Sequence, residues 1–142
     1  MIKKMNYKII AKYIKALNFN ISKPDKFVSL TKDISNYKFK IDIKSNRYKD
    51  NVIEVQTTLV LEPKDSNFDK IDALVTYSTL VEIDKDLTDK RRLEEIILIE
   101  IPNKIYPELR KAFIFIFESS GFREIKIDQV VDFKKLYLSK KN

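Results

Sequence analysis

A helix that is apolar on most of its sides is expected between Lys104 and Ser120, and it restricts what this chain can fold into. Asn103 is a suitable N-cap, and Pro107 is tolerated in a first helical turn, where a missing N–H costs little. Gly121, the only glycine of the chain, fits the left-handed residue that ends a helix. The sequence therefore marks both ends of this helix.

The apolar side chains of this helix do not form a single stripe. One stripe consists of Ile105, Leu109, Ala112, Phe113 and Ile116. Three more large side chains lie on other faces: Ile114, Phe115 and Phe117. A chain of 142 residues has too few elements to wrap such a helix alone, so we expect a second subunit to cover it. The residues expected at this oligomer interface are Ile105, Leu109, Phe113, Ile114, Phe115, Ile116 and Phe117.

Four segments with alternating apolar side chains precede the helix and predict an antiparallel sheet. They cover residues 13–21, 37–44, 52–62 and 71–83. In the first segment, the side chains expected on one side are Tyr13, Leu17, Phe19 and Ile21. Polar turns join the last three segments, whereas residues 22–36 form a long connection that is expected to pack against the fold. Residues 1–12 are expected to be a basic lead-in.

Helices are expected to follow the strands. Residues 86–101 predict one that ends before Pro102, because a proline disfavours helical geometry in the residue before it. Asp132 is a suitable cap for a short final helix, in which Phe133, Leu136 and Tyr137 share one face. Strands first and helices last indicate an α+β fold, a four-stranded antiparallel sheet followed by C-terminal helices. The length fits one domain over residues 1–142.

The composition excludes most catalytic and metal-binding sites. The chain has no histidine and no cysteine, which rules out an imidazole base, a thiol nucleophile and an ordinary zinc site. A single glycine rules out a phosphate-binding P-loop and a dinucleotide-binding fingerprint. We therefore expect that the protein is not an enzyme and that it has no catalytic residue, no metal and no cofactor.

The net charge of +7 allows two interpretations. It can mark a surface for nucleic acid or membrane, or it can reflect a lysine-rich composition. The 28 basic residues are mixed with 21 acidic ones along the chain, so we do not expect nucleic acid to be the partner. No apolar run approaches the length of a membrane span and no signal peptide is visible, so a cytoplasmic location is expected.

Several short motifs in the C-terminal half resemble one known family. They are Pro102-Asn103, Ile105-Tyr106-Pro107 with Arg110, Gly121-Phe122, and Phe133-x-x-Leu136-Tyr137. They resemble SecB, the bacterial protein-export chaperone, and the order of the strand segments also fits that family. The resemblance implies a homotetramer, built as a dimer of dimers with helices between two sheets. It also implies an ATP-independent holdase that binds unfolded preproteins for export through the Sec pathway.

The resemblance further implies where unfolded clients would bind. In SecB-like proteins the client grooves involve the second strand, the long connection before it and the final helix. The matching residues here are Phe27, Val28, Tyr37, Phe39, Ile41, Phe133, Leu136 and Tyr137. Each of them can also be explained as core, because the apolar face of an alternating strand usually packs inward.

The chain departs from the family at the site for its motor. SecB proteins hold the basic zinc-bearing tail of SecA, the motor ATPase, with carboxylates on the outer sheet face. The matching positions here are Ala16, Asn20 and Leu74, which carry no charge. SecA is therefore a possible partner without its usual acidic contacts, and a different partner, such as a toxin–antitoxin pair, is an alternative.

Two other classes stay open from the sequence. One is a basic α+β protein that binds RNA or DNA, which a steep salt dependence of binding would favour. The other is a structural oligomer without a client, which a failure to suppress aggregation would favour.

Overall fold

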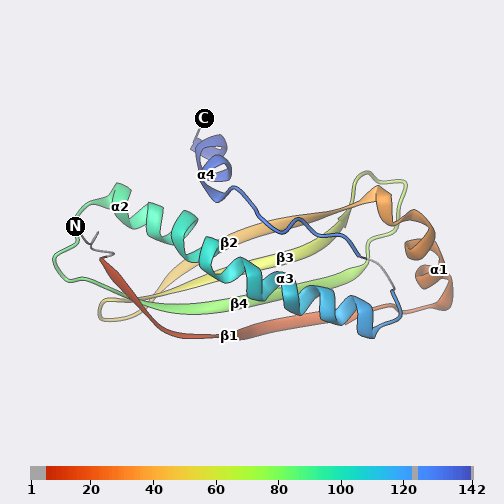
Figure 1. Cartoon of the computed structure of the whole chain (residues 1–142), viewed down its shortest axis with the longest axis horizontal. Coiled ribbons are helices and arrows are strands. Elements are labelled where there is room, and N and C mark those ends of the chain that lie inside the picture. The colour runs from red at the N-terminus through yellow and green to blue at the C-terminus, as the bar shows by residue number, and fades with distance from the viewer. Residues whose placement is uncertain (1–5, 123–124, 142) are drawn as a thin grey trace.

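The computed structural model describes residues 6–122 and 125–141. It consists of a four-stranded antiparallel sheet, a long helix that lies along one face, a helix at one end of the sheet and a C-terminal helix beside one of its long edges (Figure 1). The elements in chain order are β1 Tyr7–Asn20, α1 Pro24–Asp33, the 3₁₀ turn η1 Ile34–Asn36, β2 Tyr37–Lys49, β3 Val52–Pro63, β4 Asp72–Ile83, α2 Lys90–Glu95, the π-helical segment η2 Ile96–Glu100, α3 Ile101–Ser119 and α4 Phe133–Lys141. The predicted α+β class and the four-stranded antiparallel sheet are confirmed.

The strand order in the sheet is β1-β4-β3-β2, and every neighbouring pair is antiparallel. β1 and β2 follow each other in the chain but lie at opposite edges of the sheet. The connection between them therefore crosses the end of the sheet, and it carries α1 (Figure 1). The sequence analysis predicted a connection without a helix here, so α1 is a correction. Pro24 occupies the first turn of α1, and Leu30 is fully buried, which anchors the crossover as expected.

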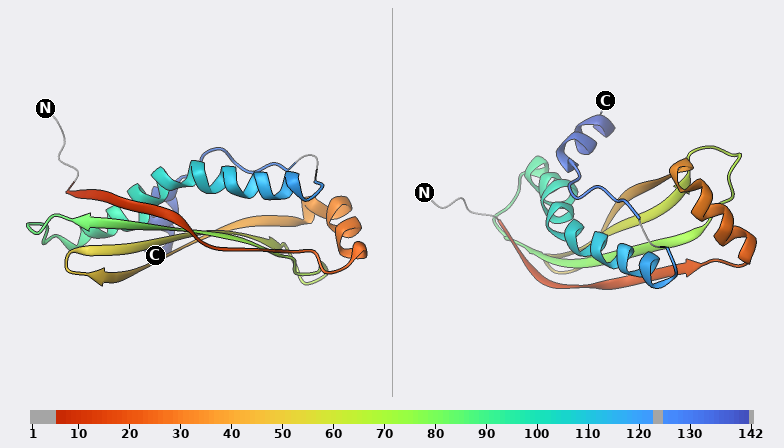
Figure 2. Two further views of the ribbon diagram at one scale, coloured as in Figure 1. Left: turned by 90° about the horizontal axis from the view of Figure 1, so that it is seen from below. Right: turned by 45° about the vertical axis from the view of Figure 1, so that its right-hand side comes forward.

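The helical layer covers one face of the sheet and leaves the other face open (Figure 2). The core lies between these layers in two apolar clusters, which are bridged by Tyr77 of β4. Leu59, Leu61 and Val75 of the sheet pack with the helix residues of the first cluster. Ring contacts join the layers directly: Phe39 of β2 meets Phe113 edge-on at 5.3 Å between ring centroids.

The two predicted helices on either side of Pro102 are one continuous helical run, so the predicted break is wrong. The run starts after Asp89, whose side chain accepts a hydrogen bond from the Arg91 N–H, and continues through α2, η2 and α3 to Ser119. In η2 the Ile101 N–H donates to the Ile96 carbonyl, a wider i→i+5 turn. The π segment and Pro102 each interrupt the usual i→i+4 ladder. Placing them together confines the disruption to one region, and the helix continues.

Two further features of α3 correct the sequence interpretation. Asn103 and Pro107 lie inside the helix and do not mark its start. Phe117 lies in the buried stripe with Ile105, Leu109 and Phe113 and not on a separate face. A four-residue step rotates a helical position by about 40°, so the stripe drifts around the helix as it follows the twisted sheet.

The C-terminal end of α3 agrees with the sequence. Gly121 has φ +109° and follows the helix directly. Its N–H donates to Glu118, and the Phe122 N–H donates to the Phe117 carbonyl, which is the hydrogen-bond pattern of a Schellman motif. The rings of Phe117 and Phe122 are 5.3 Å apart and complete the motif.

The first strand begins earlier than the alternation predicted. β1 already pairs with β4 at Tyr7, and its register shifts twice, between Ile9 and Ala11 and between Ile14 and Ala16. Each irregularity reverses the face on which later side chains lie, which hides the strand from a simple alternation test. Tyr13 therefore lies opposite Ser78, whereas Leu17 lies opposite Val75 on the helix-covered face. β2 is also longer than predicted, because the turn after it consists of only Asp50 and Asn51.

Candidate functional site

Two cavities lie in a line along β2, on the side of the sheet that carries the helices. The larger, about 510 Å³, is lined by Ile34, Ser35, Tyr37, Phe39, Lys64, Ile125 and Lys126. The smaller, about 80 Å³, is lined by Ile41, Ile43, Leu98, Leu136 and Tyr137. We call this row of cavities the β2 groove.

The floor of the β2 groove comes from alternate residues of one edge strand. Tyr37, Phe39, Ile41 and Ile43 point to the same side because side chains alternate along a strand. Tyr37 is buried, and its hydroxyl donates to the Asp69 carbonyl at 2.6 Å. Burial, and then the charges of Asp69 and Asp33, raise the pKa of Tyr37, which keeps this phenol neutral.

Ile125 and Lys126, in the connection that precedes α4, form the opposite wall of the larger cavity. This connection is fixed to α3 by two side chains of the motif that resembled a known family. Tyr106 donates its hydroxyl to the Asp128 carbonyl, and the Arg110 Nε donates to the Ile127 carbonyl at 3.0 Å. The pKa of the Tyr106 hydroxyl is raised, mainly because this side chain is buried. These motif residues therefore hold the groove wall in position.

The final helix closes part of the groove. Its first turn is capped by Asp132, whose Oδ1 accepts from the Lys135 N–H at 2.9 Å, as the sequence predicted. Phe133 is buried and meets the Tyr106 ring edge-on at 6.0 Å. The Tyr137 hydroxyl donates to Glu94 Oε2 at 2.6 Å, which ties α4 to α2. Leu136, 40% exposed, lines the smaller cavity beside Tyr137.

The structure brings together only part of the predicted client set. Tyr37, Phe39, Ile41, Leu136 and Tyr137 line the two cavities. Phe133, the first residue of α4, is buried against the Tyr106 ring and lines neither cavity. Phe27 and Val28 lie on α1 and line neither cavity. Phe27 packs against Phe122 at 4.8 Å between ring centroids, and Val28 is 63% exposed.

Several lining residues were missed in the sequence. They are Ile34, Ser35, Ile43, Lys64, Leu98, Ile125 and Lys126. Ile43 could have been predicted from the sequence, because it continues the alternation of Tyr37, Phe39 and Ile41. Leu98 could not have been predicted, because the π segment changes the direction in which side chains of this helical run point. Ile34 and Ile125 come from irregular segments, in which no period marks the buried side.

The open face of the sheet carries a buried carboxylate. Glu54 accepts hydrogen bonds from Lys15 Nζ at 2.9 Å and from the Ser78 hydroxyl at 2.6 Å. These bonds lower the pKa of Glu54 to about 2, and the bond from Lys15 has the largest effect. Burial opposes the shift. The positions matched to SecA contacts share this face: Ala16 lies opposite Thr76, Asn20 opposite Asp72, and Leu74 opposite Asn18.

Further exposed apolar side chains lie on β1 and α3, outside the β2 groove. Phe115 is 70% exposed, and Ile14 and Leu17 of β1 are also exposed. Ile114 and Ile116 are half-buried. Ile105, Leu109, Phe113 and Phe117, which the sequence placed at an oligomer interface, are buried inside the chain's own core.

The described residues place no three His, Cys, Asp or Glu side chains where they could hold a metal ion. Within the same residues, no helix combines the length and apolar character needed to cross a membrane. What the β2 groove offers is apolar surface beside a strand edge, with the ammonium groups of Lys64 and Lys126 at its rim.

Comparison with known proteins agrees with this arrangement. The family model described as preprotein translocase subunit SecB matches residues 2–142. This chain belongs to the SecB family. A SecB relative, the putative protein-export protein SecB of Pelagibacter ubique (strain HTCC1062), is 36% identical over 137 residues, which cover 96% of this chain and 98% of the relative.

A solved structure shares the SecB fold. It is the Mycobacterium tuberculosis Rv1957 SecB-like chaperone in complex with a ChAD peptide from the Rv1956 HigA1 antitoxin. The match has a TM-score of 0.64 and 9% sequence identity, and it covers 89% of this chain and 88% of that chain. At this identity the likeness concerns the fold, which is retained while nearly all side chains differ.

Proposed function

We propose that this protein is an ATP-independent holdase that binds unfolded precursor proteins for export through the Sec pathway. The observation that carries the proposal is the β2 groove, a row of two cavities with aromatic and aliphatic lining beside the edge strand of the sheet. Family membership and the export role in the printed name of the Pelagibacter relative support it. Precursors must be met before they are translocated, so the proposal implies the cytoplasm.

The groove suits an extended chain of no fixed sequence. Apolar side chains of a client would gain about 1.5–3 kcal/mol each when they are buried on Phe39, Ile41 and Leu136. β2 has one strand neighbour among the described strands, so its other edge can pair with a client backbone independently of client sequence. The sequence holds a single glycine and no phosphate-binding loop. Release would therefore follow from client folding or from a partner.

The export role is the better supported of the two partner hypotheses. The Rv1957 structure contains an antitoxin peptide, but its identity to this chain is only 9%. The Pelagibacter relative, at 36% identity, is named for protein export. A nucleic-acid role receives less support, because Glu62, Asp72 and Glu82 stand among the lysines of the open sheet face.

We also propose that the holdase is a homotetramer, a dimer of dimers. Phe115 on α3 and Ile14 and Leu17 on β1 are exposed, and an interface over them would remove large apolar side chains from water. Ile114 and Ile116 are half-buried beside Phe115 and would be covered as well. The interface assigned by this proposal is therefore smaller than the set of seven helix residues that the sequence pattern indicated.

The decisive experiment compares Leu136→Ser with Leu138→Ser. Both leucines lie on α4 with similar exposure, 40% and 49%, but only Leu136 lines the groove. We expect Leu136→Ser to reduce suppression of aggregation of an unfolded substrate several-fold and Leu138→Ser to leave it within twofold of the parent. Light scattering checks that both variants keep the parent mass. Equal activity of both variants and the parent would move Leu136 out of the client site.

The pair Phe39→Ser and Tyr137→Ser extends the same test to the floor of the groove. Each substitution should weaken client binding, but Phe39 also packs on Phe113, so part of its effect is a loss of stability. The unfolding midpoint of each variant separates these two contributions. An unfolding midpoint and an aggregation assay that both match the parent would contradict the proposal.

A further inference from the structure

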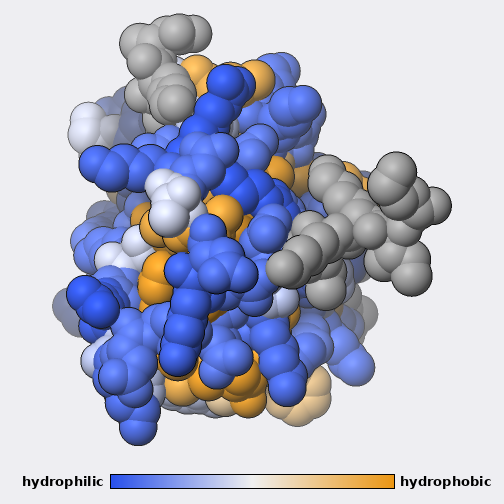
Figure 3. Space-filling model, turned by 90° about the vertical axis from the view of Figure 1, so that its left-hand side faces the viewer, coloured by the Kyte–Doolittle hydropathy of each residue, from blue (hydrophilic) through white to orange (hydrophobic). Residues whose placement is uncertain are grey.

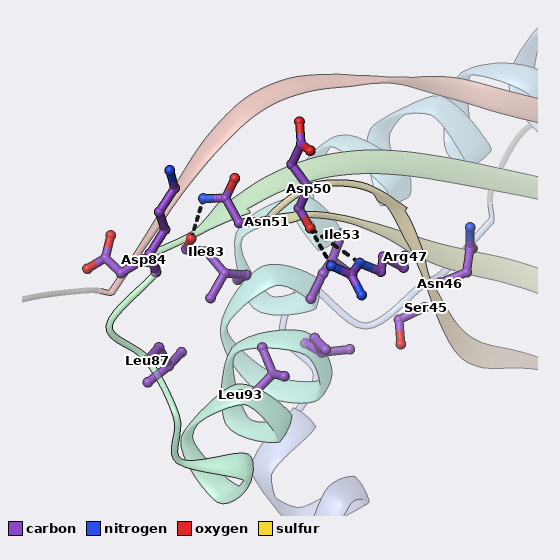
Figure 4. A pocket seen from close by; sticks show the side chains of 12 residues that line it. Ser45, Asn46, Arg47, Asp50, Asn51, Ile53, Ile83, Asp84, Leu87 and Leu93 are labelled. Atoms are coloured by element: carbon purple, nitrogen blue, oxygen red, sulfur yellow. Dashed lines mark hydrogen bonds between the residues drawn. The ribbon is translucent and has the colours of Figure 1, made fainter.

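A third cavity lies beyond the β2 groove, at the hairpin end of the sheet, and has a volume of about 520 Å³. Its apolar lining comes from Ile53, Ile83, Leu87, Leu93 and Ile97. Leu87 on the loop after β4 and Leu93 on α2 lie across it from Ile53 and Ile83 of the sheet (Figure 4). Seen from this end of the molecule, hydrophobic surface shows between hydrophilic side chains (Figure 3).

The walls of this cavity continue those of the β2 groove. Ile43 lines the smaller groove cavity, and Ser45, the next residue on the same side of β2, lines the third. On the helical side, Leu98 lines the groove and its neighbour Ile97 lines the third cavity. The π segment therefore places consecutive side chains in adjacent cavities.

The rim of the third cavity is polar and held in place. The Arg47 guanidinium donates to the Asp50 carbonyl from Nε at 3.3 Å and from Nη2 at 3.1 Å (Figure 4). Asn51 Nδ2 donates to the Ile83 carbonyl at 2.7 Å, and the Ile83 N–H donates to the Asn51 carbonyl at 2.8 Å. The Arg47 bonds hold the hairpin turn, and the Asn51 bonds join it to the end of β4, so the apolar floor is preformed.

We propose that this cavity is a third subsite for unfolded chains, reached by a client that runs in extended form along the whole edge of β2. The proposal rests on the holdase function and assigns it a longer footprint. From Tyr37 to Arg47 the strand rises roughly 33 Å, enough for a client segment of about eleven residues. An apolar client residue enters the cavity, and its polar neighbours meet the rim charges of both signs, Arg47 and Lys85 with Asp50 and Asp84.

The test uses two labelled peptides, each with leucine at alternate positions and serine between them. One has eleven residues and spans all three cavities. The other has seven and spans roughly 20 Å, the length from Tyr37 to Ile43. With the parent protein we expect the longer peptide to bind at least about tenfold more tightly, as burial of one more leucine implies.

Ser45→Trp blocks the third cavity, and Lys44→Trp is the matched control on the other side of the same strand. We expect Ser45→Trp to bring the affinity ratio of the two peptides close to one, with the affinity for the short peptide within twofold of the parent. Lys44→Trp should keep the parent ratio. A parent ratio near one, or an unchanged ratio in Ser45→Trp, overturns the third subsite and leaves the holdase function standing.

The remaining outcomes are also decisive. If neither peptide binds the parent, the holdase function fails and the subsite fails with it. If Ser45→Trp lowers the mass measured by light scattering, the cavity is an interface between copies of this chain and the subsite is refuted.

The chain has no tryptophan, so Leu87→Trp gives an independent fluorescence reporter of the third cavity. Its emission should shift to the blue with the long peptide and stay constant with the short one.

Discussion

At the scale of single residues, Glu54 is the most perturbed carboxylate described on the open sheet face. It is almost fully buried, and it is stabilised in its charged form by Lys15 and Ser78. Thr58 and Thr76 share a hydrogen bond of 2.8 Å on the same face, so the polar groups here are joined across β3 and β4. A buried charge of this kind stabilises the fold only while its partners remain.

Glu54→Gln should lower the free energy of unfolding at pH 7 by about 1–2 kcal/mol, because it removes charge-assisted hydrogen bonds. The pKa of Glu54 falls from its ordinary 4.5 to about 2 on folding, so the unfolded state binds this proton more readily. The stabilisation is therefore complete above pH 4.5 and is lost as the pH falls towards 2. Urea unfolding of both proteins across this range measures the difference.

The matched control for this prediction is Glu82→Gln. Glu82 is on β4, on the same face of the sheet as Glu54, but its side chain is exposed. Its substitution should change the unfolding free energy by less than about 0.5 kcal/mol. If the gap between the parent and Glu54→Gln stays constant from pH 6 to pH 2, the carboxylate is not the source of the stabilisation.

At the scale of elements, Gly121 shows how one residue fixes the direction of the chain after α3. A Cβ at this position would lie 3.4 Å from two ring atoms of Phe27, and its φ of +109° strains any other residue. Gly121→Ala should therefore destabilise the fold by about 1–3 kcal/mol. Denaturant unfolding beside Ser119→Ala, an exposed helical position two residues earlier, gives the measurement and its control. Equal unfolding midpoints would contradict this role of the cap.

How far the sequence predicted the elements depends on whether one period held throughout each of them. β3 and β4 keep their alternation over long segments, and they were placed to within a residue or two. β1 contains two register shifts, so Tyr13 was assigned to the wrong face. The helical run keeps its continuity through Pro102 by means of a π segment, which no local sequence rule indicates.

The same reasoning explains how much of the candidate site could be predicted. Phe39, Ile41 and Tyr137 lie in regular elements, so their shared side could be inferred from spacing together with the family resemblance. Leu98 and Ile125 depend on the π segment and on a connection that is fixed by Tyr106 and Arg110. These contacts join residues that lie far apart in the chain, and one-dimensional patterns do not report them.

At the scale of the whole molecule, the first question is what covers Phe115. Leaving a phenylalanine 70% exposed forgoes much of the roughly 1.5–3 kcal/mol that burial of such a side chain gives. If the proposed tetramer forms through this surface, Phe115→Asp should shift the protein towards smaller species at micromolar concentration. Val130→Asp is the control, because Val130 is 79% exposed and lies outside α3 and β1. Light scattering that gives a 17 kDa species for the parent protein would refute the tetramer.

The second question is whether the open face of the sheet can hold the basic zinc-bearing tail of SecA. Ala16, Asn20 and Leu74 lie on neighbouring strands and on the same face, so the positions are assembled although their charges are missing. Asp72, opposite Asn20, is an acid that remains beside them. A net charge of +7 also slows the approach of a basic peptide.

We expect the parent protein to bind such a tail peptide weakly or not at all at low salt. Exposed ion pairs contribute about 0.2–1 kcal/mol each, so three missing carboxylates together lower the affinity by about one to two orders of magnitude. The variant Ala16→Asp, Asn20→Glu, Leu74→Glu should recover this affinity in titration calorimetry. The control carries the same change in net charge at exposed positions away from this face, Val28→Glu, Ser119→Glu and Val130→Glu, and should not. Low-micromolar binding by the parent would show that this face needs no carboxylates at the three positions. Recovery only in the first variant would show that the face keeps the geometry of the contact and lacks its charge.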